Sequence, residues 1–167
     1  MNPVAPASLV VMGVAGCGKS TLAMAVAEHL GRTWLEGDRF HSEASRCKMA
    51  EGVPLTDEDR AGWLASLCEQ LRQDPGVLLT CSALKRTYRE QLRAASPGLR
   101  FAFLDIDRAQ ASRRVSARAS HFFAASLVDS QFETLESPIG EPGVLRLDAL
   151  RPLGELQAQV SDWLRQA

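Results

Sequence analysis

The sequence predicts an α/β protein in which a five-stranded parallel sheet is flanked by helices. Short apolar runs alternate with longer stretches whose apolar residues recur at helical spacing, the pattern of a parallel sheet covered on both faces. A glycine-rich segment, GVAGCGKS, connects the first apolar run to the first helical stretch. The 167 residues suit one domain, because domains cluster near ~100–150 residues.

Five short apolar runs are the strand candidates, and turn residues separate the units that contain them. Gly31 and the sequences DPG and SPG mark such turns, since glycine and proline interrupt regular structure. The predicted strands cover residues 9–14, 33–36, 77–81, 101–106 and 144–147.

The stretches between these runs have helical periodicity. In the longest, TDEDRAGWLASLCEQLRQ, Thr56 and Asp59 form a capping-box pattern at the start. One face of this helix carries the apolar residues Trp63, Leu64, Leu67, Cys68 and Leu71. The predicted helices cover residues 19–30, 56–73, 86–94, 109–118 and 152–164.

Charge and cysteine content exclude several classes of partner. Nineteen Lys and Arg against twenty Asp and Glu give a formal net charge of −1, so no overall positive field favours nucleic acid or an anionic membrane. The four cysteines lack CxxC spacing, which fits a reducing cytoplasm better than a disulfide framework or zinc site. The N-terminal apolar run has no basic start and is far shorter than the ~20 residues of a spanning helix, so we expect neither signal peptide nor anchor.

The segment GVAGCGKS matches G-x-x-x-x-G-K-[ST] and lies between a predicted strand and helix, as a phosphate-binding loop requires. Its glycines let consecutive N–H groups surround a polyphosphate, and the helix N-terminus adds a favourable dipole. Lys19 then reaches the β- and γ-phosphates, Ser20 is placed to coordinate Mg²⁺, and Thr21 to donate to the α-phosphate. The predicted ATP-binding residues of the loop are Gly13, Val14, Ala15, Gly16, Cys17, Gly18, Lys19, Ser20 and Thr21.

Two other interpretations of this loop stay open. A glycine-rich turn can merely join a strand to a helix, although the Gly-Lys-Ser ending then has no packing rationale. A thiol near a helix N-terminus and a lysine has a lowered pKa, so Cys17 is either a redox-active residue or, as we favour, a small residue that contributes only its amide.

The polar segment LEGDRFHSEASRCKMAEG follows the second predicted strand, at the sheet edge where open parallel sheets bind ligands. Asp38 is placed to accept a proton from an acceptor hydroxyl as its oxygen attacks the γ-phosphorus. Glu36 is a candidate for orienting Mg²⁺-bound water. An acid after a strand is also a common helix N-cap, and His41 is equally open between a substrate contact and a cap.

The segment CSALKRTYREQLR follows the third predicted strand and is strongly basic. Lys85 and Arg89 are four residues apart, so on a helix they share one face and form a possible clamp for a carboxylate or phosphate. The alternative is a solvated helix in which Glu90 is the counter-ion.

A basic, interrupted helical hairpin at about residues 113–136 predicts a lid. Arg113, Arg114 and Arg118 precede the aromatic pair at 122–123 and a second helix. A lid of this kind excludes water and brings an arginine onto the charge that develops on the transferred group. We assign Arg118 to that catalytic role, with Arg114 second to it and predicted to contact the nucleotide.

Several rare segments occur here in one order: MGVAGCGKS, LEGDRFH, KMAEGVPLTDEDRAGWL, CSALKRTYREQLR, HFF, QFETLE and LDALRPL. Together they resemble the gluconate kinases (gluconokinases), small P-loop kinases of the nucleoside-monophosphate-kinase type, over nearly the whole chain. The resemblance implies a P-loop NTPase fold with a helical lid, and ATP- and Mg²⁺-dependent phosphorylation of D-gluconate at its 6-hydroxyl by a cytoplasmic homodimer.

A polyhydroxy carboxylate needs cations for its carboxylate, polar partners for its hydroxyls and a base near its terminal alcohol. The catalytic residues that the resemblance implies are Asp38, Lys19 and Arg118. The implied substrate-binding residues are Asp38, His41, Lys48, Arg60, Lys85, Arg89, His121 and Gln131.

The chain departs from the family pattern at two places. The family commonly reads H-P-x-x-N after the Gly-Asp pair, whereas Ser42 and Ser45 stand here at the proline and asparagine positions. A typical lid reads R-K-G-H-F, and here Ala119 and Ser120 replace its lysine and glycine. We therefore expect altered lid closure or weaker phosphate binding, and sugar-acid choice stays open.

Other functions remain alternatives. Three of them are P-loop kinases with a different acceptor: another aldonate, shikimate or a nucleotide. CSALK lacks the glycine-rich segment of a shikimate kinase, and KMAEGVPLTDEDR argues against a nucleotide kinase. The fourth is a non-catalytic ATP-binding module whose lid presents a partner surface. An acceptor panel with ATP and Mg²⁺ separates these alternatives.

Overall fold

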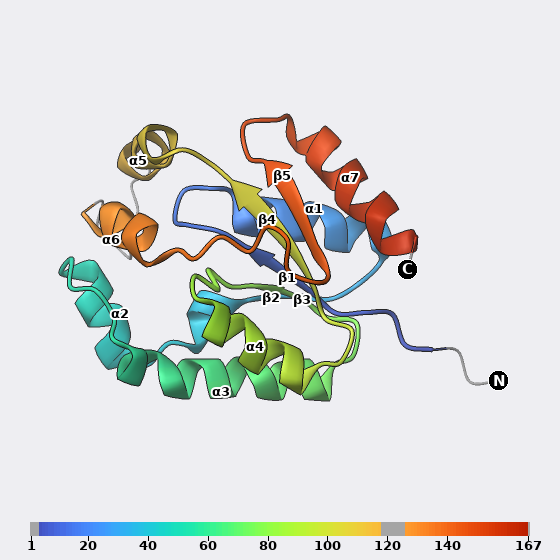
Figure 1. Ribbon diagram of the computed structural model, residues 1–167, viewed down its shortest axis with the longest axis horizontal. Helices are drawn as coiled ribbons and strands as arrows, with labels where there is room; N and C mark the ends of the chain where they lie inside the picture. Colours follow the sequence, from blue (N-terminus) through green and yellow to red (C-terminus); the bar gives the residue numbers. More distant parts are fainter. Residues whose placement is uncertain (1–3, 118–125, 167) are drawn as a thin grey trace.

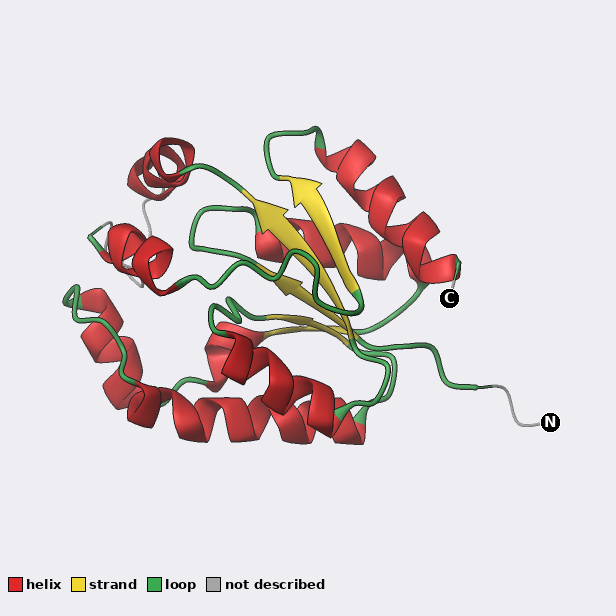
Figure 2. Ribbon diagram, viewed as in Figure 1, coloured by secondary structure: helices red, strands yellow, loops and turns green. Residues whose placement is uncertain are grey.

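The computed structural model describes residues 4–117 and 126–166, which form a parallel sheet between helical layers (Figure 1). The strand order is β2-β3-β1-β4-β5, and neighbouring strands pair in parallel. Helices lie on both sides of the sheet, as the secondary-structure colouring makes plain (Figure 2). The predicted fold class is therefore confirmed.

All five predicted strands are present, with ends displaced by at most two residues. The first strand ends two residues early because Gly13, at φ 144°, turns the chain into the next loop. The strands are β1 (Leu9–Met12), β2 (Trp34–Glu36), β3 (Leu78–Thr80), β4 (Arg100–Asp105) and β5 (Val144–Asp148).

The five predicted helices are also present, and the second helix of the predicted lid is α6. The capping box of α3 is confirmed, since Asp59 N donates to Thr56 Oγ1 at 3.1 Å and Thr56 N donates to Asp59 Oδ2 at 2.9 Å. These helices are α1 (Lys19–Leu30), α3 (Asp57–Gln73), α4 (Arg86–Ala95), α5 (Arg108–Ala117), α6 (Leu127–Thr134) and α7 (Leu153–Arg165).

Two helical elements between β2 and α3 were not predicted. The 3-10 helix η1 (Gly37–Phe40) and α2 (Glu43–Ala50) lie in the polar segment, where no apolar periodicity signals a helix. Ser42 begins α2 as its N-cap, because its Oγ accepts from Ser45 N at 3.1 Å. The structure thus assigns a capping role to the serine at the family's proline position.

The core lies on both faces of the sheet. In β1, Leu9 and Val11 face one layer with α1 and α7, whereas Val10 and Met12 face the other with α3 and α4. The whole strand is buried because both faces are covered, which explains its continuous apolar run.

The carboxyl ends of β1, β2 and β3 bring three loops together at one edge of the sheet. Gly37, directly after β2, passes so close to β3 that an added Cβ would lie 1.8 Å from Thr80 O. Gly37 N also donates to Thr80 Oγ1 at 3.0 Å. Only glycine fits this crossing, which holds the polar segment beside the phosphate-binding loop.

Candidate active site

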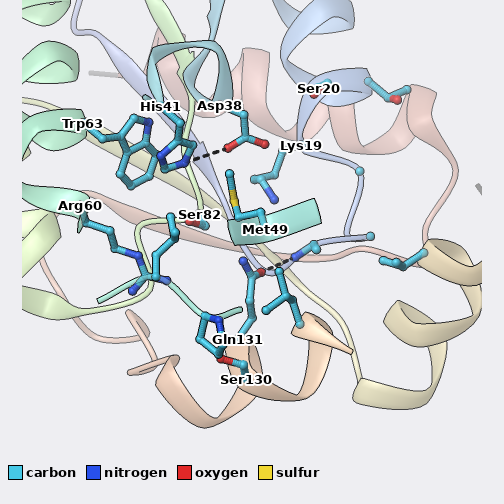
Figure 3. A pocket seen from close by; sticks show the side chains of 18 residues that line it. Lys19, Ser20, Asp38, His41, Met49, Arg60, Trp63, Ser82, Ser130 and Gln131 are labelled. Atoms are coloured by element: carbon cyan, nitrogen blue, oxygen red, sulfur yellow. Dashed lines mark hydrogen bonds and ion pairs between the residues drawn. The ribbon is translucent and has the colours of Figure 1, made fainter. Parts of the chain in front are cut away.

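A cavity of about 370 Å³ lies at this edge of the sheet (Figure 3). It is bordered by the phosphate-binding loop, by the polar segment after β2 and by α5 and α6 of the predicted lid. The predicted site residues that line it are Ala15, Gly16, Gly18, Lys19, Ser20, Thr21, Asp38, His41, Arg60 and Gln131. Residues from four parts of the sequence therefore meet in one site.

The phosphate-binding loop has the strand–loop–helix context that its motif requires. A Cβ on Gly13 would lie 2.9 Å from Leu104 O and 2.7 Å from Cys17 Sγ, so the position accepts only glycine. Lys19 folds across the loop, and its Nζ donates to Gly13 O and Val14 O, each at 3.1 Å. The ammonium group thus stands at the mouth of the loop, where a bound phosphate would compete for it.

Cys17 is buried within this loop and 1% exposed. Burial raises the pKa of its thiol, although Lys19 and Arg114 act in the opposite direction. A neutral, buried thiol does not fit the redox interpretation, because the thiolate is the reactive form. The side chain instead packs under Gly13, which agrees with the interpretation that Cys17 contributes its amide.

A chain of hydrogen bonds connects the loop to β2 and β3. Ser20 Oγ donates to Glu36 Oε2 at 2.5 Å, and Thr80 Oγ1 donates to Glu36 Oε1 at 2.6 Å. These are hard oxygen ligands of the kind that Mg²⁺ prefers, either directly or through water. Among the described residues no cluster of three or more His, Cys, Asp and Glu side chains could hold a metal ion.

Asp38 projects into the cavity from η1 and does not cap a helix. Glu36 occupies the N-cap of η1 and Ser42 that of α2, so the capping alternative for Asp38 is excluded. Partial removal from water raises the pKa of the Asp38 carboxyl. The positive charge of Lys19 opposes this rise, and the negative charge of Glu36 adds to it. Its side chain nevertheless remains 43% exposed, so a substrate can reach it.

His41 is held against Trp63 with its ring nearly parallel to the indole. The ring centroids are 4.2 Å apart with an interplanar angle of 17°, and Trp63 Nε1 donates to Gly37 O at 2.8 Å. Burial, together with the charges of Arg60 and Arg46, lowers the pKa of His41 to about 4. The imidazole is therefore neutral at physiological pH, with Nε2 3.8 Å from Asp38 Oδ1.

Of the predicted substrate-binding cations, Arg60 lines the cavity. Its Nη1 donates to Tyr88 Oη at 3.0 Å, which orients the guanidinium without neutralising its charge. Arg60 is consequently available to an anionic group in the cavity.

Lys48 and Lys85 lie away from the cavity lining. Lys48 Nζ pairs with Asp59 at 2.9 Å, and Lys85 Nζ pairs with Asp57 at 2.9 Å. Both carboxylates lie in the first turn of α3, and each lysine would have to leave its partner to contact a substrate in the cavity.

Arg89 has no exposed side-chain surface. Its Nε and Nη2 donate to Glu141 at 3.0 and 2.6 Å, and its Nη1 donates to Ala83 O at 2.7 Å. Lys85 and Arg89 therefore point to different partners, and the structure does not bring them together as a clamp. Glu90 pairs with Arg93 at 3.1 Å, so it is not the counter-ion of Arg89.

Ala83, which accepts from Arg89, lies in the left-handed region at φ 47° and is buried. A non-glycine residue there costs about 1–3 kcal/mol unless its surroundings enforce it. The neighbouring Ser82 lines the cavity. Arg89 thus holds the loop that presents Ser82 to the site.

The predicted lid is partly described. Arg114 on α5 contacts the outer side of the phosphate-binding loop, where Nη1 donates to Gly16 O at 3.4 Å and Cys17 O at 3.3 Å. On α6, Gln131 Oε1 accepts from Ala15 N at 2.7 Å. Arg118, Ala119, Ser120 and His121 lie outside the described residues, so their predicted roles stay predictions.

A protein-family profile described as an AAA domain matches residues 9–141. The chain is 47% identical over 147 residues to the gluconokinase of Gluconobacter oxydans strain 621H, covering 85% of this chain and 82% of the relative. It is 42% identical to the thermoresistant gluconokinase of Escherichia coli K12, with 86% and 85% covered. The chain belongs to the gluconokinase family.

Two solved structures are similar throughout. A gluconokinase from Sinorhizobium meliloti 1021 has a TM-score of 0.89 at 43% identity, covering 96% of this chain and 93% of that one. A sugar kinase from Janibacter sp. HTCC2649 has a TM-score of 0.91 at 41% identity, with 97% and 96% covered. The resemblance inferred from sequence segments is therefore confirmed, and with it the P-loop kinase fold.

The site of this gluconokinase family member also contains residues that sequence reasoning did not assign to it. The prediction that Trp63 belongs to the apolar face of α3 is confirmed, since it is buried in the core, but periodicity does not show that its indole also stacks on His41. The other unassigned lining residues that bear on the acceptor side are Met49, Pro54, Leu55, Ser82 and Ser130. Met49, Pro54, Leu55 and Ser82 lie within segments that resemble the family, but no local pattern assigns their side chains to the cavity.

No helix among the described residues has the length and apolar character needed to span a membrane.

Proposed function

We propose that this protein is a gluconokinase that transfers the γ-phosphoryl group of ATP to the 6-hydroxyl of D-gluconate, giving 6-phosphogluconate and ADP. The observation that carries the proposal is one cavity that holds Lys19 of the phosphate-binding loop, the carboxylate of Asp38 and the guanidinium of Arg60. These three groups match a phosphoryl donor, a hydroxyl that must lose a proton and a carboxylate on the same acceptor.

Asp38 acts as the base. Its carboxylate accepts the hydroxyl proton while the oxygen forms a bond to the γ-phosphorus and the bond from that phosphorus to ADP breaks. The raised pKa of Asp38 suits this role, because a more basic carboxylate accepts the proton more readily. Lys19 leaves its two carbonyl partners and stabilises the negative charge of the phosphate oxygens.

Ser20 and Glu36 hold Mg²⁺ in this proposal, Ser20 through its hydroxyl and Glu36 through bound water. The ion supplies charge neutralisation at the phosphates when it is bound. Arg114, which already contacts the outer side of the loop, supports the nucleotide end of the site.

Arg60 binds the gluconate carboxylate, and neutral His41 forms a hydrogen bond with one of the gluconate hydroxyls. A neutral imidazole suits a hydroxyl partner because it offers one donor and one acceptor, and it adds no charge beside Asp38. Lys48, Lys85 and Arg89 are not needed for this arrangement, since each is engaged with a carboxylate elsewhere.

A coupled assay of the purified chain with ATP and Mg²⁺ tests the proposal against gluconate, other aldonates, shikimate and nucleoside monophosphates. We expect ADP formation with gluconate in clear excess over every other acceptor. Preference for another aldonate would replace gluconate as the acceptor, and absence of ATP consumption with all acceptors would favour the binding module. We also propose that the protein is a cytoplasmic homodimer. Its molar mass, measured by light scattering during size-exclusion chromatography, tests the dimeric assembly.

A further inference from the structure

Gln131 joins the helix that follows the predicted lid to the phosphate-binding loop. Its Oε1 accepts from Ala15 N at 2.7 Å, across 116 positions of sequence. Figure 3 shows Gln131 and Ser130 entering the cavity from the side opposite Asp38, His41 and Trp63. The contact therefore lies inside the candidate active site and not on its outer wall.

The chemistry of this contact determines which way the carboxamide is turned. Ala15 N is a donor, so the oxygen of the amide must face it and the NH₂ group must face elsewhere. No hydrogen bond from Gln131 Nε2 to another described residue accompanies this contact. Within the part of the chain that the structure describes, the two hydrogens of Nε2 therefore have no protein acceptor, and Gln131 lines the cavity.

Packing and hydrogen bonds hold α6 in place. Leu127 and Val128 are buried, and Val128 packs with the core beneath α1. Just beyond the helix, Glu136 N donates to Leu84 O at 2.8 Å, and Arg89 Nη2 donates to Glu136 O at 2.9 Å. The backbone that carries Gln131 is therefore held in place by contacts other than the Gln131 hydrogen bond itself.

The order of the loop identifies the part of the nucleotide that faces Gln131. Lys19 Nζ, which binds the β- and γ-phosphates in the proposed function, lies 3.1 Å from the carbonyl oxygen of Val14, the residue before Ala15. Thr21, predicted to donate to the α-phosphate, lies instead in the first turn of α1. The terminal phosphoryl group must lie within reach of Lys19 and near the base Asp38. A donor beside Ala15 is consequently adjacent to the oxygens of the phosphoryl group that is transferred.

We propose that Gln131 binds the terminal phosphoryl group of ATP through Nε2 while its Oε1 stays on Ala15 N. The inference deepens the proposed function and rests on it for the identity of the donor. It gives the site a neutral donor that recognises the third phosphate, and so the triphosphate in preference to the diphosphate. It also replaces the expectation that Gln131 contacts the sugar acid.

The test measures binding of ADP and of a non-hydrolysable ATP analogue, adenylyl imidodiphosphate, by calorimetry with Mg²⁺ and without gluconate. Gln131→Met keeps the length of the side chain but has neither amide group. We expect its preference for the analogue over ADP to fall about tenfold, the effect of one hydrogen bond to a charged group, with ADP affinity changed less than about twofold.

Gln131→Glu keeps an acceptor near Ala15 N but replaces the donor with a negative charge, so we expect an even larger loss of preference for the triphosphate. Glu133→Gln, an exposed change on the same helix, is the matched control and should leave both affinities unaltered. Thermal melting of each variant shows whether it is folded, and the two Gln131 variants are independent of one another in that respect.

Two results would overturn the inference. An unchanged ratio of analogue to ADP affinity in both folded variants means that Nε2 does not contact the third phosphate. Tighter analogue binding by Gln131→Met means that Oε1 instead competes with phosphate for Ala15 N and must leave. Gluconate is absent from this experiment, so its result does not depend on whether gluconate is the acceptor. A raised KM for gluconate with an unchanged nucleotide ratio would restore the sugar-acid assignment.

Discussion

The buried pair of Arg89 and Glu141 permits a quantitative test of what this arginine does. The Glu141 carboxylate is 9% exposed and accepts from Arg89 Nε at 3.0 Å, from Arg89 Nη2 at 2.6 Å and from Arg93 Nη1 at 2.9 Å. Glu141→Gln keeps the shape and one acceptor oxygen but removes the charge and the second acceptor. Arg89, with no exposed surface, would then be buried without a counter-charge.

Breaking a buried pair by removing one partner costs about 3–5 kcal/mol, and we expect the lower end, about 3 kcal/mol, because the glutamine oxygen keeps one bond. For a chain of this length each kcal/mol lowers Tm by about 2–4 °C, so the expected decrease is about 6–12 °C. Glu90→Gln is the matched control, because Glu90 pairs with Arg93 on the surface and is 54% exposed. Exposed pairs contribute about 0–1 kcal/mol.

The pH dependence of this difference follows from the pKa of Glu141. Burial acts to raise it, but hydrogen bonds and charge from Arg89 and Arg93 outweigh burial and lower it below the ordinary 4.5. A lowered folded-state pKa stabilises the protein above the unfolded-state pKa, and this contribution is lost as pH falls through the folded-state value. The difference in Tm between wild type and Glu141→Gln should therefore be largest at pH 7 and should decrease as pH falls below about 4.5.

Thermal denaturation at pH 7 and gluconate kinetics of the folded variant decide the question together. A Tm within about 2 °C of wild type would refute the stability reasoning. A large rise in the KM for gluconate without loss of stability would restore Arg89 as the substrate contact that the sequence predicted.

Three further predictions concern the cavity. Asp38→Asn should lower kcat by about 10²–10⁴, the usual range for general base assistance, with ATP binding by calorimetry little changed; near-normal turnover would remove Asp38 from the base role. The pH profile of kcat/KM should have one acidic limb, and its midpoint should lie above 3.8 because burial raises the pKa of Asp38. His41 has a pKa of about 4, so it should add no step between pH 5 and 8. Loss of the acidic limb in His41→Asn would contradict the assignment of that limb to Asp38. Arg60→Met should raise the KM for gluconate about 10–100-fold with a smaller effect on the KM for ATP, as expected for a lost charged hydrogen bond, whereas Lys48→Met, away from the cavity, is the control.

Much of the fold and part of the site followed from sequence because the signals were local. Continuous apolar runs identified strands that are buried on both faces, and the Thr56–Asp59 pair identified the start of α3. The glycine-rich loop was recognisable because its function depends on consecutive backbone amides, which glycine spacing reveals. The helix α2 was missed because its polar residues give no apolar periodicity, and its start depends on one serine cap.

The basic residues were the least predictable part of the site. Lys48, Lys85, Arg60 and Arg89 have the same charge in sequence, yet Arg60 lines the cavity and the other three pair with carboxylates on other elements. Charge alone does not determine a partner, because the partner of Arg89 is 52 positions away. Periodicity correctly places Trp63 in the core, but it cannot show that the same indole stacks on His41.

The sequence by itself determined the α/β class, the phosphate-binding loop and the family, because each rests on residues that are neighbours in the chain or on segments in a fixed order. Tertiary structure decided which charges remain available, why His41 is neutral and how Gln131 meets Ala15. Those properties arise from burial and from distances between segments that lie far apart in sequence. They become visible only when the carboxyl ends of β1, β2 and β3 are brought to one edge of the sheet.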